Sequence, residues 1–259
     1  MSVFIHESAI VSPKAKIGED CHIGAFSVVG DEVVLGNRVH LESHVVIDGK
    51  TSVGDETRVF PFVSIGLAPQ DLKYKGEPTA TEIGKRNHLR EFVTIHRGTT
   101  GGGGLTKIGD DNLLMAQAHV AHDCQIGNEV IMANAATLAG HVTIADRANV
   151  GAYSGVHQFC RVGREAFVGG YSVVVKDALP FAISQGNHAK CYGLNRLGMK
   201  RRGHSKESIE NLHHAYHLLL SSKLNTSQAV ERMKAEIADC AEVDYLIEFI
   251  ESSKRGVVK

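Results

Sequence analysis

The sequence of 259 residues has little of several residue types that mark particular classes of protein. It contains no Trp and only 6% aromatic residues, so smaller aliphatic side chains have to fill its core. The formal net charge is −1, and the longest basic run is Lys200–Arg202. This argues against a nucleic-acid partner, because general nucleic-acid binding needs many cations to neutralise phosphates. No apolar run approaches the roughly 20 residues of a membrane span.

Cysteine is also scarce. Five Cys, an odd number without paired spacing, fit a reducing compartment better than a disulfide framework. The N-terminal residues lack the basic and long apolar regions of a signal peptide. We therefore expect a soluble, cytoplasmic protein with no membrane span, whose 43% hydrophobic residues suffice for a sizeable core.

What the sequence has in abundance is a six-residue repeat. An aliphatic residue recurs at every sixth position from Ile5 to Ile65, again from Ile83 to Ile95, and from Ile108 to Val174. All of these positions are Ile, Val or Leu except Met132. The fifth position of the hexad is nearly always small or β-branched, and on a strand it faces the same way as the next first position. The period indicates a short strand and a turn, with Gly, Asn or Asp easing the bend.

This repeat resembles that of the hexapeptide-repeat acyltransferases, whose fold is a left-handed parallel β-helix. The resemblance implies a mainly β fold with three hexads in each triangular coil, which we assign to residues 1–180. Interruptions at about 66–82 and 99–107 predict loops on one face, often the binding face. Helical patterning after Pro180 predicts a C-terminal helical domain over 181–259, with one helix capped by Ser205, a second starting at Thr226, and a third.

The three-hexad register also places several histidines along one edge of the predicted β-helix. Coils of three hexads place the turns that follow Ile95, Val120, Leu138 and Val156 along one edge, and these turns carry His96, His122, His141 and His157. His119 lies on the approach to this edge, and His122, Gly140 and Gln158 are each 18 residues apart. Each of these histidines taken singly could be a solvated turn residue. Together they suggest proton transfer near neutral pH, with zinc ligation as the alternative.

The cysteines do not suggest a nucleophile. Cys21, Cys124 and Cys160 all occupy the inward fifth position of a hexad, where they serve as core filler. No Ser–His pairing is evident either. Attack assisted by a general base is therefore favoured over a covalent intermediate.

Longer motifs narrow the resemblance to the UDP-N-acetylglucosamine O-acyltransferase family, and they span essentially the whole chain. The matching stretches are Gln70–Pro78, Val93–Thr99, Gly102–Lys107, Asn112–Met115, Ala121–Cys124, Ala136–His141, Val156–Cys160 and Gln185–His188. The resemblance implies transfer of an (R)-3-hydroxyacyl group from acyl carrier protein to the 3-hydroxyl of UDP-N-acetylglucosamine, the first step of lipid A synthesis. It also implies a homotrimer that uses no cofactor and no metal.

The same resemblance assigns roles to residues. His122 would be the general base, Asp123 would orient its ring, and the Gly140 backbone N–H would stabilise the oxyanion. Substrate contacts would fall on Asp71, Lys73, His96, His119, His141, His157, Gln158, Asn195 and Arg201. Gly170 would act as an acyl-chain ruler, a glycine there suggesting a long tail, with His188 at the far end of the groove.

Several alternatives stay open at this point. Leu197 stands where the family usually has an acidic residue, so UDP-N-acetylglucosamine and its 3-amino analogue are both candidate acceptors. The N-acyltransferase of the same pathway has an extra N-terminal domain, whereas the hexads here begin at Ile5. A zinc hydratase and a non-catalytic scaffold share the fold, although the histidine-rich edge argues against a scaffold.

Overall fold

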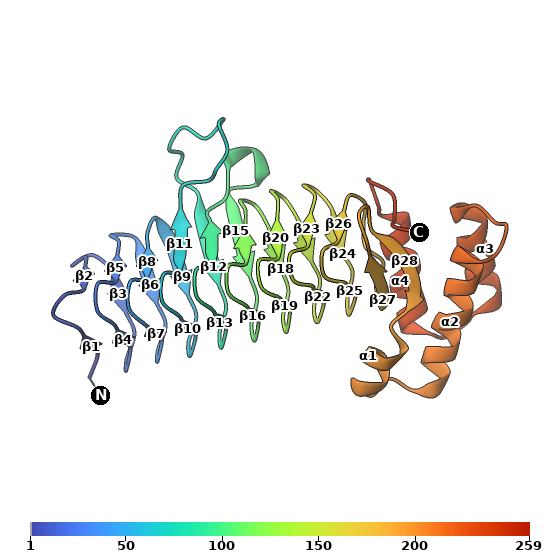
Figure 1. Cartoon of the computed structure of the whole chain (residues 1–259), viewed down its shortest axis with the longest axis horizontal. Coiled ribbons are helices and arrows are strands. Elements are labelled where there is room, and N and C mark those ends of the chain that lie inside the picture. Colours follow the sequence, from blue (N-terminus) through green and yellow to red (C-terminus); the bar gives the residue numbers. More distant parts are fainter. Residues whose placement is uncertain (1) are drawn as a thin grey trace.

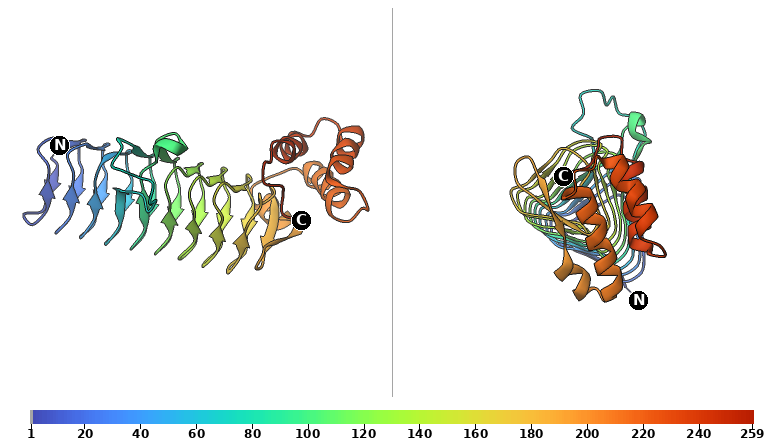
Figure 2. Two further views of the ribbon diagram at one scale, coloured as in Figure 1. Left: turned by 90° about the horizontal axis from the view of Figure 1, so that it is seen from above. Right: turned by 90° about the vertical axis from the view of Figure 1, so that its right-hand side faces the viewer.

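The computed structural model describes residues 2–259 as a long triangular prism of stacked coils with helices at one end (Figure 1). The end-on view in Figure 2 shows the three sides of the prism and two loops that project from one corner. No helix among the described residues is both long and apolar enough to cross a membrane.

Three parallel sheets form the sides of the prism, which we call sheets A, B and C. Sheet A contains β1 (Phe4–Ile5), β4 (His22–Ile23), β7 (His40–Leu41), β10 (Arg58–Val59), β13 (His88–Leu89), β16 (Leu113–Leu114), β19 (Ile131–Met132), β22 (Asn149–Val150), β25 (Phe167–Val168), β27 (Ala182–Gln185) and the antiparallel β28 (Lys190–Leu194). Sheet B contains β2 (Ile10–Val11), β5 (Val28–Val29), β8 (Val46–Ile47), β11 (Ser64–Leu67), β14 (Thr94–His96), β17 (His119–Val120), β20 (Thr137–Leu138), β23 (Gly155–Val156) and β26 (Val173–Val174). Sheet C contains β3 (Lys16–Ile17), β6 (Val33–Leu35), β9 (Lys50–Val53), β12 (Ala80–Ile83), β15 (Leu105–Ile108), β18 (Gln125–Ile126), β21 (Thr143–Ile144) and β24 (Arg161–Val162).

The inward positions of the hexad form the core of the prism. The fifth-position residues Val39 and Val45 and the first-position residues Leu41 and Ile47 are all fully buried. Equivalent residues of successive coils pair in register, as Ile23 does with Leu41. The predicted inward pattern is therefore confirmed. It weakens only at the first coil, where Ile5 is 46% exposed because no coil covers it.

The turns differ from the expectation that Gly, Asn or Asp eases each bend. The left-handed residue is the fourth of the hexad, and many side chains occupy it, including Arg38, His44 and Phe62. The frequent glycine at the second position is required for a different reason. A Cβ on Gly18 would lie 2.4 Å from the carbonyl oxygen of Gly36 in the next coil. Glycine there permits close stacking of coils.

Both predicted interruptions are loops, each slightly shorter than expected. The first lies between β11 and β12, and the second lies between β14 and β15 and includes the short 3-10 helix η1 (Thr100–Gly102). Figure 1 shows both rising from the same side of the prism.

The C-terminal residues form α1 (Arg196–Arg201), α2 (Lys206–Leu220), α3 (Thr226–Glu236) and α4 (Ala241–Glu251). Ser205 caps α2 and α3 begins at Thr226, as predicted. We did not predict α1, and β27 continues sheet A beyond residue 180. The exact boundary between the two proposed domains stays a prediction.

Candidate active site on the histidine edge

The turns that lead from sheet B to sheet C form what we call the histidine edge: residues 96–98, 121–123, 139–141 and 157–159. The hexads that precede them pair as predicted, Ile95 with Val120, Val120 with Leu138, and Leu138 with Val156. The register therefore brings histidines from four successive coils to one edge.

His122 is fixed by a buried carboxylate. Its Nδ1 lies 2.8 Å from Oδ2 of Asp123, whose side chain is 0% exposed. That carboxylate also accepts hydrogen bonds from the Thr99 backbone N–H at 2.8 Å and the Thr99 hydroxyl at 2.6 Å. A carboxylate held in this way favours the proton on Nδ1 of His122, which leaves Nε2 as a proton acceptor. Thr99 lies in the second interruption of the repeat, the loop between β14 and β15. This loop thus helps to set the tautomer of His122.

Gly140 lies directly against the His122 ring. A Cβ on Gly140 would be 2.5 Å from Cε1 and 2.7 Å from Nε2 of His122. The residues aligned with it one coil before and after are His122 and Gln158, so this turn position accepts side chains. Among residues 2–259, no acceptor engages the Gly140 backbone N–H. A free N–H beside an imidazole can stabilise negative charge while the ring moves a proton.

His141 packs beside His122. Their ring centroids are 5.1 Å apart in a T-shaped arrangement, and His141 stacks on Phe159 at 4.3 Å. Burial lowers the pKa of His141 from its ordinary value, against the opposing effects of Asp123 and Asp71. The ring is therefore favoured in its neutral form, able both to donate and to accept a hydrogen bond.

His96 and His119 form a second pair, with ring centroids 5.2 Å apart. Burial lowers the pKa of His96 to about 4 and also lowers the pKa of His119, and the neighbouring histidines add to both effects. The Thr94 hydroxyl lies 2.7 Å from Nδ1 of His119. Nδ1 of His96 is buried, and within residues 2–259 it has no hydrogen-bond partner. A buried polar atom without a partner is costly, which suggests that a bound molecule completes the site.

The first interruption of the repeat, the loop between β11 and β12, reaches toward this edge. Asp71 lies close enough to His141 to influence its pKa, and its carboxylate accepts a hydrogen bond from the Lys73 backbone N–H at 3.0 Å. The Lys73 side chain is exposed. His157 and Gln158 are exposed as well, on the last turn of the histidine edge.

The remaining four predicted site residues lie away from this cluster. Gly170 is on a turn from sheet A to sheet B, and exposed His188 is on the turn between β27 and β28. Asn195 caps α1, accepting a hydrogen bond from the Gly198 backbone N–H at 3.0 Å. Arg201 is exposed in the last turn of that helix.

The zinc alternative required a cluster of histidines. Among residues 2–259, the ligand atoms that lie within 4.8 Å of one another come from His122, Asp123 and His141. Two histidines and a carboxylate could ligate a metal, but this carboxylate already holds His122 and Thr99. The set of three histidines expected of a hydratase is not assembled there.

Cys124 is a core residue, as predicted. Its side chain is fully buried, and its thiol donates to the Ala139 carbonyl oxygen at 3.2 Å. Burial raises its pKa to about 12, so the thiol stays protonated and is a poor nucleophile.

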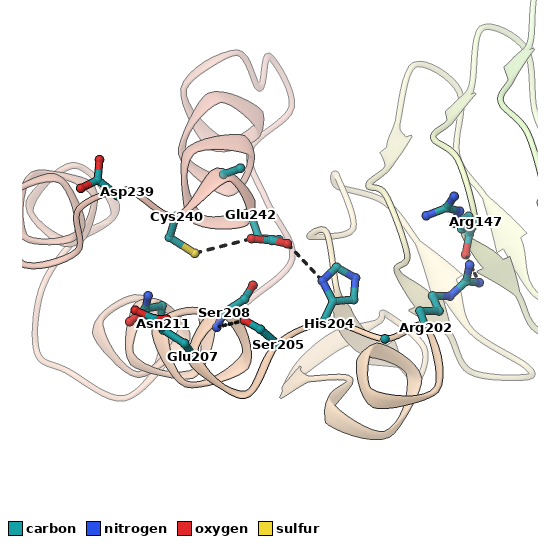
Figure 3. Close-up of a pocket in the computed structure, with 12 residues that line it drawn as sticks. Arg147, Arg202, His204, Ser205, Glu207, Ser208, Asn211, Asp239, Cys240 and Glu242 are labelled. Atoms are coloured by element: carbon teal, nitrogen blue, oxygen red, sulfur yellow. Dashed lines mark hydrogen bonds and ion pairs between the residues drawn. The ribbon is translucent and has the colours of Figure 1, made fainter.

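Sequence reasoning missed one polar cluster, at the junction of the prism and the helices (Figure 3). His204 lies between two carboxylates, with Nε2 3.0 Å from Glu165 and Nδ1 3.1 Å from Glu242. Figure 3 also shows Arg202 pointing toward Arg147, whose carbonyl oxygen it contacts at 2.9 Å. No repeat or motif marks these residues, because they come together only when the helices dock on the last coils.

Comparison with known proteins identifies the family. A model described as UDP-N-acetylglucosamine O-acyltransferase, domain 2, matches residues 177–258, and a model of the bacterial transferase hexapeptide matches 14–49 and 105–140. An acyl-[acyl-carrier-protein]–UDP-N-acetylglucosamine O-acyltransferase from Thermodesulfovibrio yellowstonii is 49% identical over 98% of this chain and 99% of its own length. The chain belongs to the UDP-N-acetylglucosamine O-acyltransferase family.

Solved structures of the family agree. LpxA from Acinetobacter baumannii is 44% identical, with a TM-score of 0.97 over 99% of this chain and 100% of that one. A UDP-N-acetylglucosamine acyltransferase from Bacteroides fragilis is 40% identical with the same TM-score and coverage. The left-handed parallel β-helix with C-terminal helices is thus confirmed, and the chain is an O-acyltransferase and not a scaffold or a hydratase.

Proposed function

We propose that this chain transfers an (R)-3-hydroxyacyl group from acyl carrier protein to the 3-hydroxyl of UDP-N-acetylglucosamine, as the first step of lipid A synthesis. The observation that carries the proposal is the arrangement around His122. Its Nδ1 is held by the buried Asp123, while Nε2 adjoins Gly140, whose N–H is free among the described residues. The names of the relatives supply the substrates.

The proposed reaction proceeds by direct attack. Nε2 of His122 removes the proton of the sugar hydroxyl as that oxygen attacks the thioester carbonyl carbon. The Gly140 N–H donates to the resulting oxyanion. When the tetrahedral intermediate collapses, the C–S bond breaks and the departing thiolate of the carrier takes the proton from His122. A positioned base of this kind contributes about 10² to 10⁴-fold in rate.

The other residues of the edge would bind substrate as neutral groups. His96, His119 and His141 have lowered pKa values, so they can contact hydroxyls without adding positive charge beside the base. Two further pairs would border the same edge. The loop between β11 and β12 contributes Asp71 and Lys73, and the last turn of the histidine edge contributes His157 and Gln158. Leu197, which stands where the family usually has an acidic residue, is 60% exposed beside the α1 cap Asn195. The hydroxyl and the 3-amino acceptor are therefore both tested below.

We also propose a homotrimer. The outward residues of sheets A and B are largely apolar or histidine, for example Phe4, His22, His40, Leu113, Ile131 and Phe167 in A and Ile10, Val28, Val46 and Val173 in B. Those of sheet C are largely polar, for example Lys16, Glu82, Lys107, Gln125, Thr143 and Arg161. The edge between A and B is lined by exposed Phe26, Phe62, Phe92, Tyr153 and Tyr171. Contiguous apolar surface of this kind marks a protein interface.

In such a trimer, sheet A of one copy would lie against sheet B of the next, so that the histidine edge borders the contact. Asn195 and Arg201, which lie away from their own histidine edge, would then act on the site of a neighbouring copy. Sedimentation should give the mass of three 28.0 kDa chains. A monomer at working concentration would contradict this part of the proposal.

The decisive test is an acyl-transfer assay. UDP-N-acetylglucosamine and its 3-amino analogue are each paired with carrier proteins that bear (R)-3-hydroxyacyl chains of several lengths. We expect transfer to the hydroxyl acceptor, with a long chain preferred because Gly170 leaves room for it. Transfer to neither acceptor would refute the proposed function. Preference for the amine would correct the acceptor and leave the mechanism in place.

A further inference from the structure

The loop between β11 and β12, which we call the first loop, makes no hydrogen bond to the prism. It comprises residues 68–79 and projects from one side of the prism (Figure 1). Within residues 2–259, all of its hydrogen bonds are internal. For example, the Tyr74 hydroxyl and the Lys75 N–H both donate to Glu77, each at 2.8 Å. Such a loop depends on side-chain packing to hold one position.

Arg97, on the histidine edge, supplies a packing contact of this kind. The Cζ atom of its guanidinium group lies 5.9 Å from the centroid of the Tyr74 ring. An arginine within about 6 Å of an aromatic ring face is attracted to the ring electrons. Tyr74 is half-buried, whereas Lys73 and Lys75 on either side of it are exposed. The first loop therefore meets the prism where Tyr74 contacts Arg97.

The prism has a place for the Arg97 side chain. Gly49, on the turn after β8, has a φ of +63°, and a Cβ on it would clash with Nη1 of Arg97. The guanidinium group thus lies against bare backbone two strands before β14, the strand that leads to Arg97. Nε of Arg97 is buried and has no hydrogen-bond partner among residues 2–259. Packing against Gly49 therefore fixes the direction of this side chain.

Arg97 also holds the base of the first loop. Its backbone N–H donates to the carbonyl oxygen of Leu67, the last residue before the loop, at 3.2 Å. The residue before Arg97 is His96, and β14 pairs with β17, the strand that leads to His122. One residue thus contacts the loop at two points, directly beside the histidines of the site.

The first loop carries groups that reach the histidine edge. Asp71 lies close enough to His141 to influence its pKa, and its carboxylate accepts a hydrogen bond from the Lys73 N–H. The Tyr74 N–H donates to the Asp71 carbonyl oxygen at 3.0 Å. The ring that contacts Arg97 and the two residues proposed to bind substrate therefore belong to one hydrogen-bonded turn. A displacement of the ring would displace both of them.

We propose that Arg97 is a positioning residue: through Tyr74 it holds the first loop so that Asp71 and Lys73 meet the sugar nucleotide at the histidine edge. The inference rests on the proposed function and adds to it a residue without an assigned role. Arg97 takes no part in the proton transfer, which is assigned to His122. Its loss should weaken substrate binding and leave the chemical step in place.

The first experiment measures the loop itself, without substrate. Lys75 is exposed in the first loop, so the rate of trypsin cleavage after Lys75, followed by mass spectrometry, reports how often the loop leaves the prism. Loss of a cation–π contact shifts an equilibrium by about 2- to 30-fold. Arg97→Gln and Tyr74→Leu should therefore each raise the cleavage rate by about threefold or more.

The second experiment measures acyl transfer. In Arg97→Gln, the KM for UDP-N-acetylglucosamine should rise about three- to tenfold while kcat changes by less than about twofold, which is the pattern of a lost binding contact. Tyr74→Leu should give the same pattern. The double variant should be no worse than either single variant, because both changes remove one contact.

Arg164→Gln is the matched control for both experiments. Arg164 also lies on a turn of the prism and stacks on a tyrosine, with Cζ 4.2 Å from the ring centroid of Tyr245, but this tyrosine belongs to α4. The substitution removes an arginine–tyrosine contact that does not involve the first loop. Cleavage after Lys75, kcat and KM should all stay as in the unmodified protein.

Three results would overturn the inference. Unchanged cleavage after Lys75 in Arg97→Gln would show that the arginine does not hold the loop. A raised KM in Arg97→Gln with a normal KM in Tyr74→Leu would mean that the arginine contacts the substrate directly. Additive effects in the double variant would show that the two residues act separately.

The design also separates this inference from the proposed function. If the unmodified enzyme transferred no acyl group to the sugar nucleotide, the proposed function would fail, and the cleavage rates would still decide whether Arg97 holds the loop. Tyr74 lies in a projecting loop outside the core, so Tyr74→Leu keeps both experiments open if Arg97→Gln does not fold.

Discussion

On the edge between sheets C and A, which we call the charged edge, the left-handed turn position carries Arg86, Asp111 and Arg147 among others. On the histidine edge, the same backbone position carries Asp123 and His141. The turns of the two edges have the same backbone conformation, so the two edges differ in their side chains. Arg86 pairs with Asp111 in the next coil at 2.6 Å, and alternating charges continue along that edge. Its charged groups are satisfied by each other.

The two edges also differ in whether their backbone N–H groups have hydrogen-bond acceptors. On the charged edge, the Asp110 N–H donates to the side chain of Asn128 at 2.8 Å, and the Asn128 N–H donates to Asp146 at 2.7 Å. This ladder satisfies the N–H groups of both Asp110 and Asn128. On the histidine edge, the equivalent N–H of Gly140 has no acceptor among residues 2–259, and Nδ1 of His96 is buried without a partner. A repeat can satisfy its own polar groups, and here it leaves these two unsatisfied where we propose that substrate binds.

The largest expected effect comes from removing the proposed base. His122→Ala should lower kcat by at least about 10²-fold with both substrates saturating, because the sugar hydroxyl then loses its proton acceptor. Circular dichroism and the melting temperature should match the unmodified protein, since His122 is partly exposed and outside the core. Turnover close to that of the unmodified enzyme would remove His122 from its assigned role.

Gly140→Ala should have the next largest effect. Its methyl group would lie within 2.7 Å of two His122 ring atoms, so the ring has to turn away from Asp123. We expect a loss of about tenfold or more in kcat/KM, because a displaced base transfers protons poorly. Gln158, at the same position one coil on, indicates that the fold accepts a side chain there. An active variant would mean that the contact with His122 is not needed for catalysis.

Much of this comparison could be predicted from the sequence. The hexad places Leu114, Val120 and Cys124 inside the prism, and counting in coils puts His122 beside Gly140, because a solenoid converts sequence spacing directly into spatial neighbours. The family motifs then supplied the chemistry.

Other features could not be predicted, for physical reasons. Thr99 reaches Asp123 through an irregular loop, which the repeat does not describe. His204 and Glu165 meet only after the helices dock. The sequence predicts that glycine eases the bend of each turn, whereas Gly18 permits the close stacking of coils. Spacing alone does not distinguish a backbone requirement from a steric one.

The two edges should also respond to different ranges of pH. The pKa of His96 is lowered to about 4 by burial, from an ordinary value of 6.5. The unfolded chain therefore binds more protons than the folded one between these values, and stability falls as the pH drops from 6.5 toward 4. The hydrogen bond to Arg86 lowers the pKa of Asp111 from its ordinary value of 3.8. The stability that Asp111 contributes is therefore lost only as the pH falls below about 3.8.

His96→Gln should therefore reduce the fall in melting temperature between pH 7 and pH 4.5, because the amide does not titrate in this range. Melting followed by circular dichroism at several pH values would measure this. Asp111→Asn is the matched control, which should leave that part of the profile unchanged. An identical pH profile for His96→Gln and the unmodified protein would show that burial of His96 does not limit stability.

The smallest effect is expected on the charged edge. Arg86 pairs with Asp111 and Asp110, but its side chain is 47% exposed, and exposed ion pairs contribute little to stability. Arg86→Ala should lower the melting temperature slightly in low salt, and the difference should disappear in high salt, because added ions screen the pair. Acyl transfer should be unaffected. A large loss of activity in this variant would mean that the charged edge also takes part in substrate binding, and that the two edges differ less than their hydrogen bonds suggest.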